Sequence, residues 1–574
     1  MTNKKKTERI FTPVRNLTHY IDVMESHGDR VAFRYFNKNH ELQEMTYGAY
    51  ATLIRNEVAG FVKMGLAGKR IAVMGETSPF WVATYISAIV AGGVAIPMDR
   101  ELDMKEVEGF LLFAEADAVV YSSILNEKFA DMALAHRGVA TLIPMEPEGI
   151  SYAECEWVVP LGEVLTLGAQ AREAGEVAEP QEPENLERMA VMLFTSGTTG
   201  TSKCVMLCEK NVCAAANAAC NTVEFSRDDV IVSVLPIHHT YELCIMLAAS
   251  IYGMQVCIND SLKRVMKNIA FFKPTGMVLV PLFVTTMNKK IWEEARKKGQ
   301  EKKLRAAIRI SKASRAVGID LRKKLFAEVR AAFGGRLEKI ISGAAPLNPE
   351  ITEIFDQFGI QICEGYGITE CSPLLSVTPY YAPKPGSVGK AVDCADVKID
   401  VDHTDEAGHE VGEILAKGDN VMLGYYKNPE ETAKVFTEDG YFRTGDVGYI
   451  DKDGYIYITG RKKFVIVMES GKNVFPEEIE EYLSEIDLIS ECVVVGRKAP
   501  DSDEIILTAV VYPAFDLFSE EDRKDPEAMR KQIEARIQPL NKKLVSYKHI
   551  KAVEIRMEEF ERTTSRKIKR HLVK

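Results

Sequence analysis

The sequence lacks the excess of positive charge that most nucleic-acid-binding proteins carry. Its 574 residues include 83 Asp or Glu against 72 Lys or Arg, and the formal net charge is −11. Binding along a phosphate backbone needs a basic face, so nucleic acid is excluded as the main partner. Any anionic ligand must be held by local groups and not by the field of the whole protein.

Paired cysteine ligands are also missing. None of the eleven cysteines forms a C-x-x-C pair, and the nearest histidines after the cysteine cluster at 204–220 are His238 and His239. This spacing argues against a zinc site. Scattered thiols that pack as small apolar groups are typical of a reducing compartment, so we expect a cytoplasmic protein.

Secretory and membrane-spanning segments are not evident. The first residues, MTNKKKTERIF, are basic but no apolar core follows them, so they do not form a secretory signal. The stretch 80–97, FWVATYISAIVAGGVAIP, is uncharged over eighteen residues, the lower limit for a spanning helix. Gly92 and Gly93 divide it, which favours a helix, a glycine turn and a buried strand over a membrane span.

Hydrophobic patterns predict a large α/β domain in the first part of the chain. Helix-like segments there alternate with uniformly apolar strand-like segments, and Asp103 with Glu106 predicts the start of a helix that runs to Ala114. Such alternation indicates two parallel-type sheets covered by helices. The predicted strands include 69–75, 117–123, 229–236, 276–281 and 337–343.

The pattern changes after about residue 385. Glycines become frequent and strands become short, and Asp453 with Gly454 predicts a hairpin over 447–460. After Arg461, the tail has its own series of strand-like and helix-like segments. We therefore expect a large N-terminal domain over 1–461, with a small β-barrel-like subdomain at 385–460, and a small mobile α+β C-terminal domain over 462–574.

The stretch FTSGTTGTSK, residues 194–203, follows the apolar run MAVML and is expected at the carboxyl end of a buried strand. A glycine-rich turn lets backbone N–H groups converge on an anion, while hydroxyls add donors and Lys203 adds a positive charge. A triphosphate is the natural ligand for such a turn. The run does not fit G-x-x-x-x-G-K-[ST], and a flexible loop without a ligand is the alternative for this run by itself.

Four more motifs follow in order: ISGAAPL (341–347), EGYGITECSP (364–373), YFRTGDVGYIDKDGYIYITGRKK (441–463) and RTTSRKIKR (562–570). With the first stretch they resemble the adenylate-forming superfamily of acyl-CoA synthetases, luciferases and peptide-synthetase adenylation domains. The resemblance extends over nearly the whole chain. With LPIHHTYE at 235–242, the sequence is most similar to the bacterial long-chain fatty acyl-CoA synthetases.

The resemblance implies a ligase reaction in two steps. A carboxylate attacks the α-phosphate of ATP, which releases pyrophosphate and leaves an acyl-adenylate. A thiol, usually that of coenzyme A, then displaces AMP to give a thioester. The charge that develops on the phosphoryl oxygens must be met by cations and fixed hydrogen-bond donors.

The resemblance also implies which residues bind the nucleotide. Tyr366, followed by Gly367, would stack on adenine, and Gly343 and Ala344 would present backbone to the purine edge; for Tyr366 a core tyrosine is the alternative. The β- and γ-phosphates would be bound by Thr195, Ser196, Gly197, Thr198, Thr199, Gly200 and Lys203.

Further roles fall on residues of the later motifs. Thr369 would bind the α-phosphate, and Glu370 would hold Mg²⁺ with Thr195 as a second contact. Asp446 would accept hydrogen bonds from the ribose hydroxyls, and Arg461 would reach the ribose. A turn aspartate is the alternative for Asp446.

Lys567 is implied as the catalytic lysine, because ERTTSRKIKR aligns with the family pattern P-K-T-x-S-G-K-I. A solvated basic tail is the alternative, and Arg566 stands where Gly is usual. A second departure is SKC at 202–204, where the family usually has P-K-G. Lys463 would be the hinge of the mobile domain, and Gly471 and Lys472 would line the approach of the thiol.

The substrate is predicted from LPIHHTYE. His239 would lie beside the substrate carboxylate, where amino-acid-activating relatives tend to carry Asp, so a fatty acid is favoured. A core or capping histidine is the alternative, and Glu242 could supply the missing acid. The expected acceptor is coenzyme A or acyl carrier protein, which share the phosphopantetheine arm.

Two other function classes stay open. One is a ligase for an aryl or amino acid, and the other is a nucleotide-binding protein without catalysis, against which Glu370, Asp446, Arg461 and Lys567 argue. Residues 289–312 carry ten Lys or Arg against three Glu. A solvated helix surface explains this segment, and a basic face for anionic lipid headgroups is the second interpretation. A homo-oligomer is compatible with the sequence.

Overall fold

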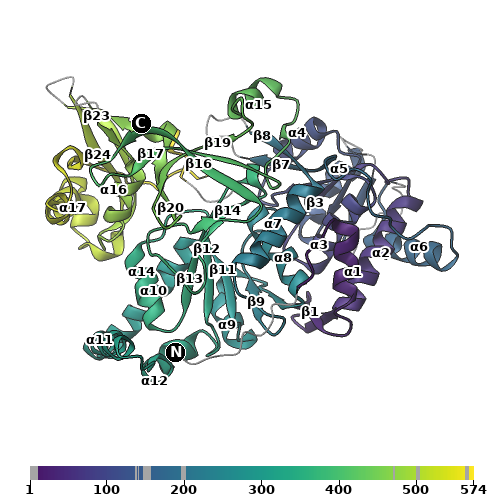
Figure 1. Ribbon diagram of the computed structural model, residues 1–574, viewed down its shortest axis with the longest axis horizontal. Coiled ribbons are helices and arrows are strands. Elements are labelled where there is room, and N and C mark those ends of the chain that lie inside the picture. Colours follow the sequence, from purple (N-terminus) through teal and green to yellow (C-terminus); the bar gives the residue numbers. More distant parts are fainter. Residues whose placement is uncertain are drawn as a thin grey trace. The chain divides into compact units, whose positions relative to one another are not determined.

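The computed structural model describes residues 11–135, 139, 141–146, 157–195, 202–468, 472–499, 504–562 and 568–573. These residues divide into two compact units, drawn in Figure 1. The first contains residues up to 195, 202–397 and 416–442, and the second contains 398–415 and the chain from 443 onward. The domain boundary predicted at 461/462 falls within the second unit and stays a prediction about which segment moves.

A seven-stranded sheet, in the order β18-β8-β7-β4-β3-β5-β6, forms one half of the first unit. The strands from β7 to β6 run parallel, whereas β8 and β18 are antiparallel at one edge. The predicted parallel sheet is thus confirmed and has an antiparallel margin. Its strands are β3 (Arg70–Met74), β4 (Val94–Met98), β5 (Ala118–Tyr121), β6 (Thr141–Pro144), β7 (Met189–Thr195), β8 (Lys203–Cys208) and β18 (Gly424–Tyr425).

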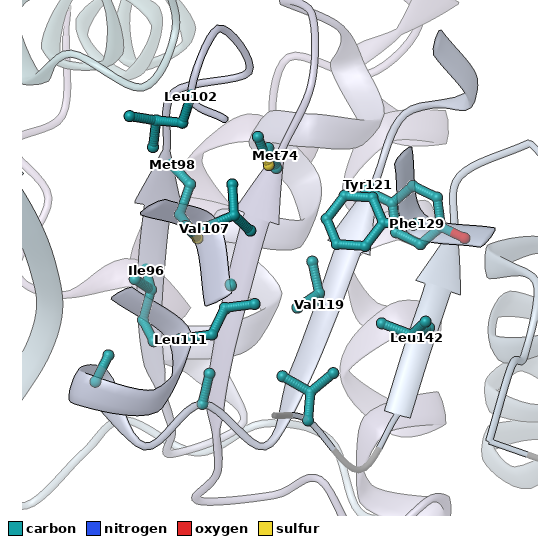
Figure 2. Close-up of a cluster of buried hydrophobic side chains, with 14 of the residues drawn as sticks. Met74, Ile96, Met98, Leu102, Val107, Leu111, Val119, Tyr121, Phe129 and Leu142 are labelled. Atoms are coloured by element: carbon teal, nitrogen blue, oxygen red, sulfur yellow. The ribbon is translucent and has the colours of Figure 1, made fainter. Parts of the chain in front are cut away.

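Helix α4 (Met104–Ala114) shows how the sequence builds this half. Asp103 caps it by accepting hydrogen bonds from the backbone N–H groups of Lys105 and Glu106, as predicted. Val107 and Leu111 recur on one face and are fully buried against β3, β4 and β5 (Figure 2). Burial of each such side chain contributes about 2 kcal/mol, so the apolar periodicity fixes which face meets the sheet.

The uncharged stretch at 80–97 forms α3 (Pro79–Val90), a turn and β4. Gly92 takes the left-handed conformation with φ +83°, which allows the chain to reverse directly after the helix. The predicted helix, turn and strand are confirmed. Among the described residues, every helix is too short or too polar to cross a bilayer.

A nine-stranded sheet, in the order β15-β14-β13-β12-β11-β9-β10-β1-β2, forms the other half of the first unit. The six strands from β13 to β1 are parallel, and the outer strands are antiparallel. Its strands are β1 (Val31–Phe36), β2 (Leu42–Thr46), β9 (Val230–Ser233), β10 (Gln255–Ile258), β11 (Gly276–Leu279), β12 (Lys339–Gly343), β13 (Gln361–Gly367), β14 (Leu374–Val377) and β15 (Lys390–Ala391).

Helices cover both sheets, as expected for parallel strands joined by crossovers. Two of them, α2 (Tyr47–Lys63) and α6 (Leu161–Glu173), approach so closely that a Cβ at Gly168 would lie 1.8 Å from the carbonyl oxygen of Asn56. The other α-helices described in the first unit are α1 (Leu17–Glu25), α5 (Asn126–Ala135), α7 (Glu209–Thr222), α8 (Thr240–Tyr252), α9 (Val265–Phe272), α10 (Pro281–Lys297), α11 (Glu301–Ala316), α12 (Arg322–Leu325), α13 (Ala327–Ala332), α14 (Pro349–Gln357) and α15 (Pro429–Val435).

The second unit contains a four-stranded sheet, a two-stranded sheet and a three-stranded sheet. The predicted hairpin at 447–460 is confirmed, and Gly454 at φ +81° forms its turn. The predicted alternation in the tail is confirmed as well. The elements are β16 (Ala395–Thr404), β17 (Glu410–Gly418), β19 (Phe442–Ile450), β20 (Ile456–Arg461), β21 (Ile466–Val467), β22 (Asn473–Val474), α16 (Pro476–Leu483), β23 (Ile489–Lys498), β24 (Ile505–Pro513), α17 (Pro526–Asn541) and β25 (Ile550–Ile555).

Candidate functional site

The serine, threonine and glycine stretch lies between two paired strands. Thr195 ends β7 and Lys203 begins β8, and the two residues face each other across the hairpin. The hydroxyl of Thr195 donates to the carbonyl oxygen of Lys203 at 3.3 Å. Because β7 is parallel to β4, the hairpin starts at the carboxyl edge of the sheet, where ligands bind in α/β folds. The predicted phosphate-binding residues 196–200 lie outside the described residues.

Lys203 has two partners that hold its charge in place. Its ammonium lies 2.8 Å from Oε2 of Glu431 and 4.7 Å from the centre of the Tyr425 ring. Hydrogen bonds from Lys203 and Lys434 lower the pKa of Glu431 to about 2, so its carboxylate is ionised at neutral pH. The helix α15 thus presents a carboxylate, and the strand β18 an aromatic ring, to Lys203, the cation predicted to bind phosphate.

Tyr425 connects the two halves of the first unit. Its hydroxyl donates to Oε1 of Glu370 at 3.0 Å, and the backbone N–H of Met422 donates to the carbonyl oxygen of Glu370 at 2.8 Å. Burial, together with the Glu370 carboxylate, raises the pKa of Tyr425 far above its usual range, so the hydroxyl stays a donor. A residue of the seven-stranded sheet therefore orients a carboxylate that follows β13 of the nine-stranded sheet.

The surroundings of Glu370 fit Mg²⁺ of the kind that accompanies a nucleotide. Glu370 and Thr369 are half-buried in a short 3-10 helix, η3 (Thr369–Cys371). Across the described ranges, the structure has no cluster of three or more His, Cys, Asp or Glu able to hold a metal. A single carboxylate suits Mg²⁺, which keeps several waters and takes its other ligands from substrate phosphates.

The predicted purine-binding residues meet at the ends of two neighbouring strands. Gly343 ends β12 and pairs with Gly365 of β13, which continues through Tyr366 to Gly367. A Cβ at Gly367 would lie 2.0 Å from the carbonyl oxygen of Pro373, so no larger residue fits there. Tyr366 is 7% exposed, and Ala344 adopts φ +74° directly after β12. These residues form one continuous backbone edge beside an aromatic ring.

An apolar cavity opens from this edge. The space between its walls is about 790 Å³ with open solvent included, and no charged side chain of the described residues lines it. Four of its lining residues are the predicted purine-binding residues Gly343, Ala344, Tyr366 and Gly367, and the rest of the lining includes Ala219, Val223, Phe225, Ile231, Tyr241, Cys244, Ile245, Ala248, Tyr252 and Met254.

Strand register gives the offset between the Gly343 edge and Ile231, another residue of the lining. Ile231 is level with Gly276, which in turn is level with Lys339, and Gly343 lies four residues further along the same strand direction. At about 3.3 Å per residue, the lining extends roughly 13 Å below the Gly343 edge.

His239 is the residue before α8 and is half-buried. Its ring centre lies 4.1 Å from that of His238, and it is not among the residues that line the cavity. Burial lowers the pKa of His238 to about 4, so this ring is neutral at pH 7. The role of His239 beside a substrate carboxylate stays a prediction.

Glu242 does not present a negative charge to the cavity. It is buried on α8, and the hydroxyl of Ser233 donates to its carboxyl group. Burial raises the pKa of Glu242 to about 8, so the group is mainly protonated at pH 7. The suggestion that Glu242 meets a substrate ammonium group therefore receives no support from its surroundings.

In the second unit, the two predicted ribose-binding residues form an ion pair. Asp446 on β19 and Arg461 on β20 are paired in register, and Nε of Arg461 lies 2.7 Å from Oδ1 of Asp446. The predicted hinge residue Lys463 follows in η4 (Lys462–Phe464), exposed, with its ammonium 4.6 Å from the ring centre of Phe464.

The remaining predicted residues are those of the thiol approach and the catalytic lysine. Lys472 is exposed, and its ammonium lies 5.9 Å from the ring centre of Tyr547. Gly471 and Lys567 lie outside the described residues. Their roles stay predictions.

Sequence reasoning missed Tyr425 and Glu431. Both belong to GYYKNPEE at 424–431, where Asn428 and Pro429 signal the start of a helix, because Asn is a favoured cap and Pro a favoured first residue. That signal could have located α15. It could not show that Glu431 reaches Lys203, which is 228 residues away in the chain.

Comparisons with known proteins agree with this geometry. The family described as "AMP-binding enzyme" matches residues 22–426, and the family described as "AMP-binding enzyme C-terminal domain" matches residues 463–574. The long-chain-fatty-acid–CoA ligase FadD15 of Mycobacterium bovis is 28% identical over 480 residues, which cover 80% of this chain and 76% of that protein.

A human relative and a solved structure extend the comparison. The long-chain-fatty-acid–CoA ligase ACSBG1 of Homo sapiens is 28% identical over 510 residues, which cover 83% of this chain and 68% of that protein. The crystal structure of ATP-bound MatB from Rhodopseudomonas palustris has a TM-score of 0.72 and 25% identity, and the match covers 97% of this chain and 98% of that one.

Proposed function

The chain belongs to the family of AMP-binding enzymes, and we propose that it activates a fatty acid with ATP and transfers the acyl group to coenzyme A. The observation that carries the proposal is the uncharged cavity that begins at Gly343, Ala344, Tyr366 and Gly367. A site that joins a backbone edge and an aromatic ring to an apolar cavity suits a ligand with a polar head and an alkyl tail.

In the proposed first step, a carboxylate oxygen of the acid bonds to the α-phosphorus of ATP, and the bond from that phosphorus to the bridging oxygen of pyrophosphate breaks. Lys203 would neutralise phosphate oxygens, and Thr369 would donate a hydrogen bond to the α-phosphate. Mg²⁺, when bound at Glu370, would supply further positive charge to the leaving pyrophosphate. Tyr425 keeps the Glu370 carboxylate oriented.

In the proposed second step, the sulfur of coenzyme A bonds to the acyl carbon, and the bond between that carbon and the AMP oxygen breaks. The thiol proton passes to solvent. We propose Lys567 as the group that stabilises charge in the first step, Asp446 and Arg461 as ribose-binding groups, and Lys463 as the hinge that lets the thiol enter. Gly471 and Lys472 would line the approach of that thiol.

A fatty acid is favoured over an amino acid for a physical reason. A substrate ammonium group needs an ionised partner, and the cavity lining contains none among the described residues. Glu242, the nearby candidate, is buried and mainly uncharged at pH 7. An aryl acid is the second candidate, because the cavity is partly lined by aromatic rings such as Phe225 and Tyr241.

The test is ATP–pyrophosphate exchange with a panel of fatty, aryl and amino acids, followed by thioester formation with coenzyme A and with acyl carrier protein. We expect exchange with fatty acids and acyl-CoA as product. Exchange with amino acids only would contradict the proposal, and thioester formed only on the carrier protein would identify a different acceptor.

A single substitution tests whether the cavity holds the alkyl chain. Ala248 lines the cavity on α8, eight residues after the helix begins at Thr240, so Ala248→Leu should reduce kcat/KM for long acids by about tenfold or more. Short acids, which do not reach Ala248, are the control within the same variant. An equal loss for short and long acids would mean that the cavity does not hold the chain.

A further inference from the structure

The helix α11 has two apolar faces, and only one of them is used for folding. Leu304, Ala307 and Ile308 pack against the core of the nine-stranded sheet, and Ser311 donates to Oε1 of Gln357 at 2.9 Å. These residues recur at the spacing of one helix face. They dock α11 on its neighbours α10, α12 and α14 (Figure 1).

The second apolar face of α11 points to solvent. Ile310 is 51% exposed and Val317, directly after the helix, is 73% exposed. Ala306 and Ala313 are exposed too and lie at three- and four-residue spacings from them, so the four side chains form one stripe. We call these four residues the exposed stripe. Ile319, just beyond, is also exposed.

Basic side chains border the exposed stripe on both sides. By helical position Lys303 lies along one edge, and Lys302 with Arg309 lies along the other. These three residues have no ion-pair partner in the parts of the chain that the structure describes, whereas Arg305 pairs with Glu301 at 2.8 Å. Three cations beside an apolar stripe are therefore available for another molecule.

The charge of this region is opposite to that of the whole chain. Residues 289–324 contain fourteen Lys or Arg and four Asp or Glu, although the formal net charge of the protein is −11. Such local concentration of positive charge attracts an anionic surface even when the net charge opposes it. The apolar stripe adds a second, non-electrostatic contribution to binding.

We propose that the exposed stripe and its three basic neighbours bind the surface of an anionic lipid bilayer. Short aliphatic side chains can enter the boundary between headgroups and acyl chains, while long Lys and Arg side chains extend to the phosphates. A protein partner would be expected to meet larger aromatic anchors. The large aromatic ring of Trp292 is half-buried, with the guanidinium of Arg305 4.8 Å from its centre.

The test is flotation of the full-length protein with vesicles of phosphatidylcholine alone and vesicles that also contain phosphatidylglycerol. We expect binding only to the anionic vesicles, and weaker binding at high salt because exposed charges are screened. The triple variant Lys302→Gln, Lys303→Gln, Arg309→Gln should bind about a hundredfold more weakly, since each basic residue near the surface contributes to the attraction.

Two further variants separate the apolar contribution to vesicle binding from the effect of charge alone. Ile310→Ser with Val317→Ser removes apolar area and keeps all charges, and it should weaken binding about tenfold. Lys531→Gln, Lys542→Gln, Lys543→Gln removes the same charge from exposed positions elsewhere and should bind as the wild type does. Circular dichroism and the Tm of each variant confirm that the chain remains folded.

Three results would overturn the proposal. They are absence of binding to anionic vesicles, an equal loss in the control triple variant, and unchanged vesicle binding in the Lys302, Lys303 and Arg309 variant. If that variant instead lost binding to an acidic acyl carrier protein, the stripe would be a protein-docking surface. The vesicle assay contains no ATP or coenzyme A, so its outcome is independent of the proposed ligase activity.

Discussion

The Nε atom of Arg461 lies 2.7 Å from Oδ1 of Asp446, and the two residues face each other across the β19–β20 hairpin. Asp446 is only 3% exposed, so its carboxylate is held by a cation in a largely desolvated place. An ion pair of this kind fixes the direction in which the carboxylate oxygens can accept further hydrogen bonds. The sequence predicted that both residues bind ribose, and the structure brings them together.

The first prediction concerns this pair. Asp446→Asn keeps the shape of the side chain but removes its charge, so it weakens hydrogen bonds to two ribose hydroxyls. We expect the KM for ATP in pyrophosphate exchange to rise about tenfold or more. The control is Glu406→Gln, which removes an exposed carboxylate from a turn of the same unit. An unchanged KM in Asp446→Asn would contradict the assigned role.

A second prediction tests the orientation of Glu370. Tyr425→Phe removes the hydroxyl that donates to Glu370 but keeps the ring beneath Lys203. We expect the Mg²⁺ concentration for half-maximal exchange to rise about tenfold, because partners of a metal ligand tune its affinity. Mg²⁺-dependent binding of ATP, followed by calorimetry, should shift in parallel.

The neighbouring tyrosine provides the control for this experiment. Tyr426→Phe removes a hydroxyl that bonds Glu115 and Arg70 instead of Glu370. It should leave the Mg²⁺ requirement unchanged. If both variants had the same effect, general destabilisation and not the orientation of Glu370 would be the cause.

The third prediction addresses the basic tail. Lys567→Ala should lower pyrophosphate exchange at least about a hundredfold, because one positioned positive charge would be lost from the adenylation step. Thioester formation from supplied acyl-adenylate should be largely preserved. Lys569→Ala is the matched control two residues away. Full exchange activity in Lys567→Ala would show that the tail is only a solvated basic segment.

The fourth prediction follows from a buried carboxyl group between α2 and α3. Thr84 and Ser87 donate hydrogen bonds to Glu57 at 2.5 and 3.0 Å, and burial raises the pKa of Glu57 from 4.5 to about 8. Between these values the folded chain keeps a proton that the unfolded chain releases. The free energy of unfolding contributed by Glu57 therefore falls as pH rises, by up to about 1.4 kcal/mol per pH unit.

Glu57→Gln removes this titration and keeps most of the shape. The Tm of the variant relative to the wild type should increase as pH rises from 5.5 to 8.5, and the exposed substitution Glu163→Gln should show no such trend. A constant difference in Tm across this range would mean that Glu57 does not change protonation on unfolding.

The fifth prediction concerns Glu242 and the class of substrate. Because Glu242 is mainly protonated at pH 7, Glu242→Gln should retain activation of fatty acids within about threefold. If Glu242 were an ionised partner for a substrate ammonium group, this variant would lose its activity completely. Pyrophosphate exchange with the same acid panel distinguishes these outcomes.

Local patterns predicted many of the elements. The cap at Asp103, the division of 80–97 by glycines and the turn at Gly454 each act through residues close in sequence, and each is confirmed. The antiparallel return of β8 beside β7 was not predicted. Its pairing depends on which strands border β7 in the sheet, and that is a matter of topology and not of local preference.

The candidate site also divides into features that local sequence predicts and contacts that depend on topology. Motif residues such as Tyr366 and Glu370 could be named from the sequence, because the stretches that carry them are short and continuous. Their partners could not, since Tyr425 reaches Glu370 across 55 residues and Glu431 reaches Lys203 across 228. Contacts at such separations leave no periodicity or spacing that a sequence pattern can detect.

The sequence by itself determined the motifs and their order, whose resemblance to known enzymes pointed to the family. It also determined many of the strands and helices that carry them, because these depend on short-range backbone preferences and apolar periodicity. Only the tertiary structure decided that Lys203 has a carboxylate partner, that Glu242 is buried and mainly uncharged, and that an uncharged cavity lies below Gly343. Charge state and cavity shape depend on what surrounds a group in space, and those surroundings exist only once distant segments have packed together.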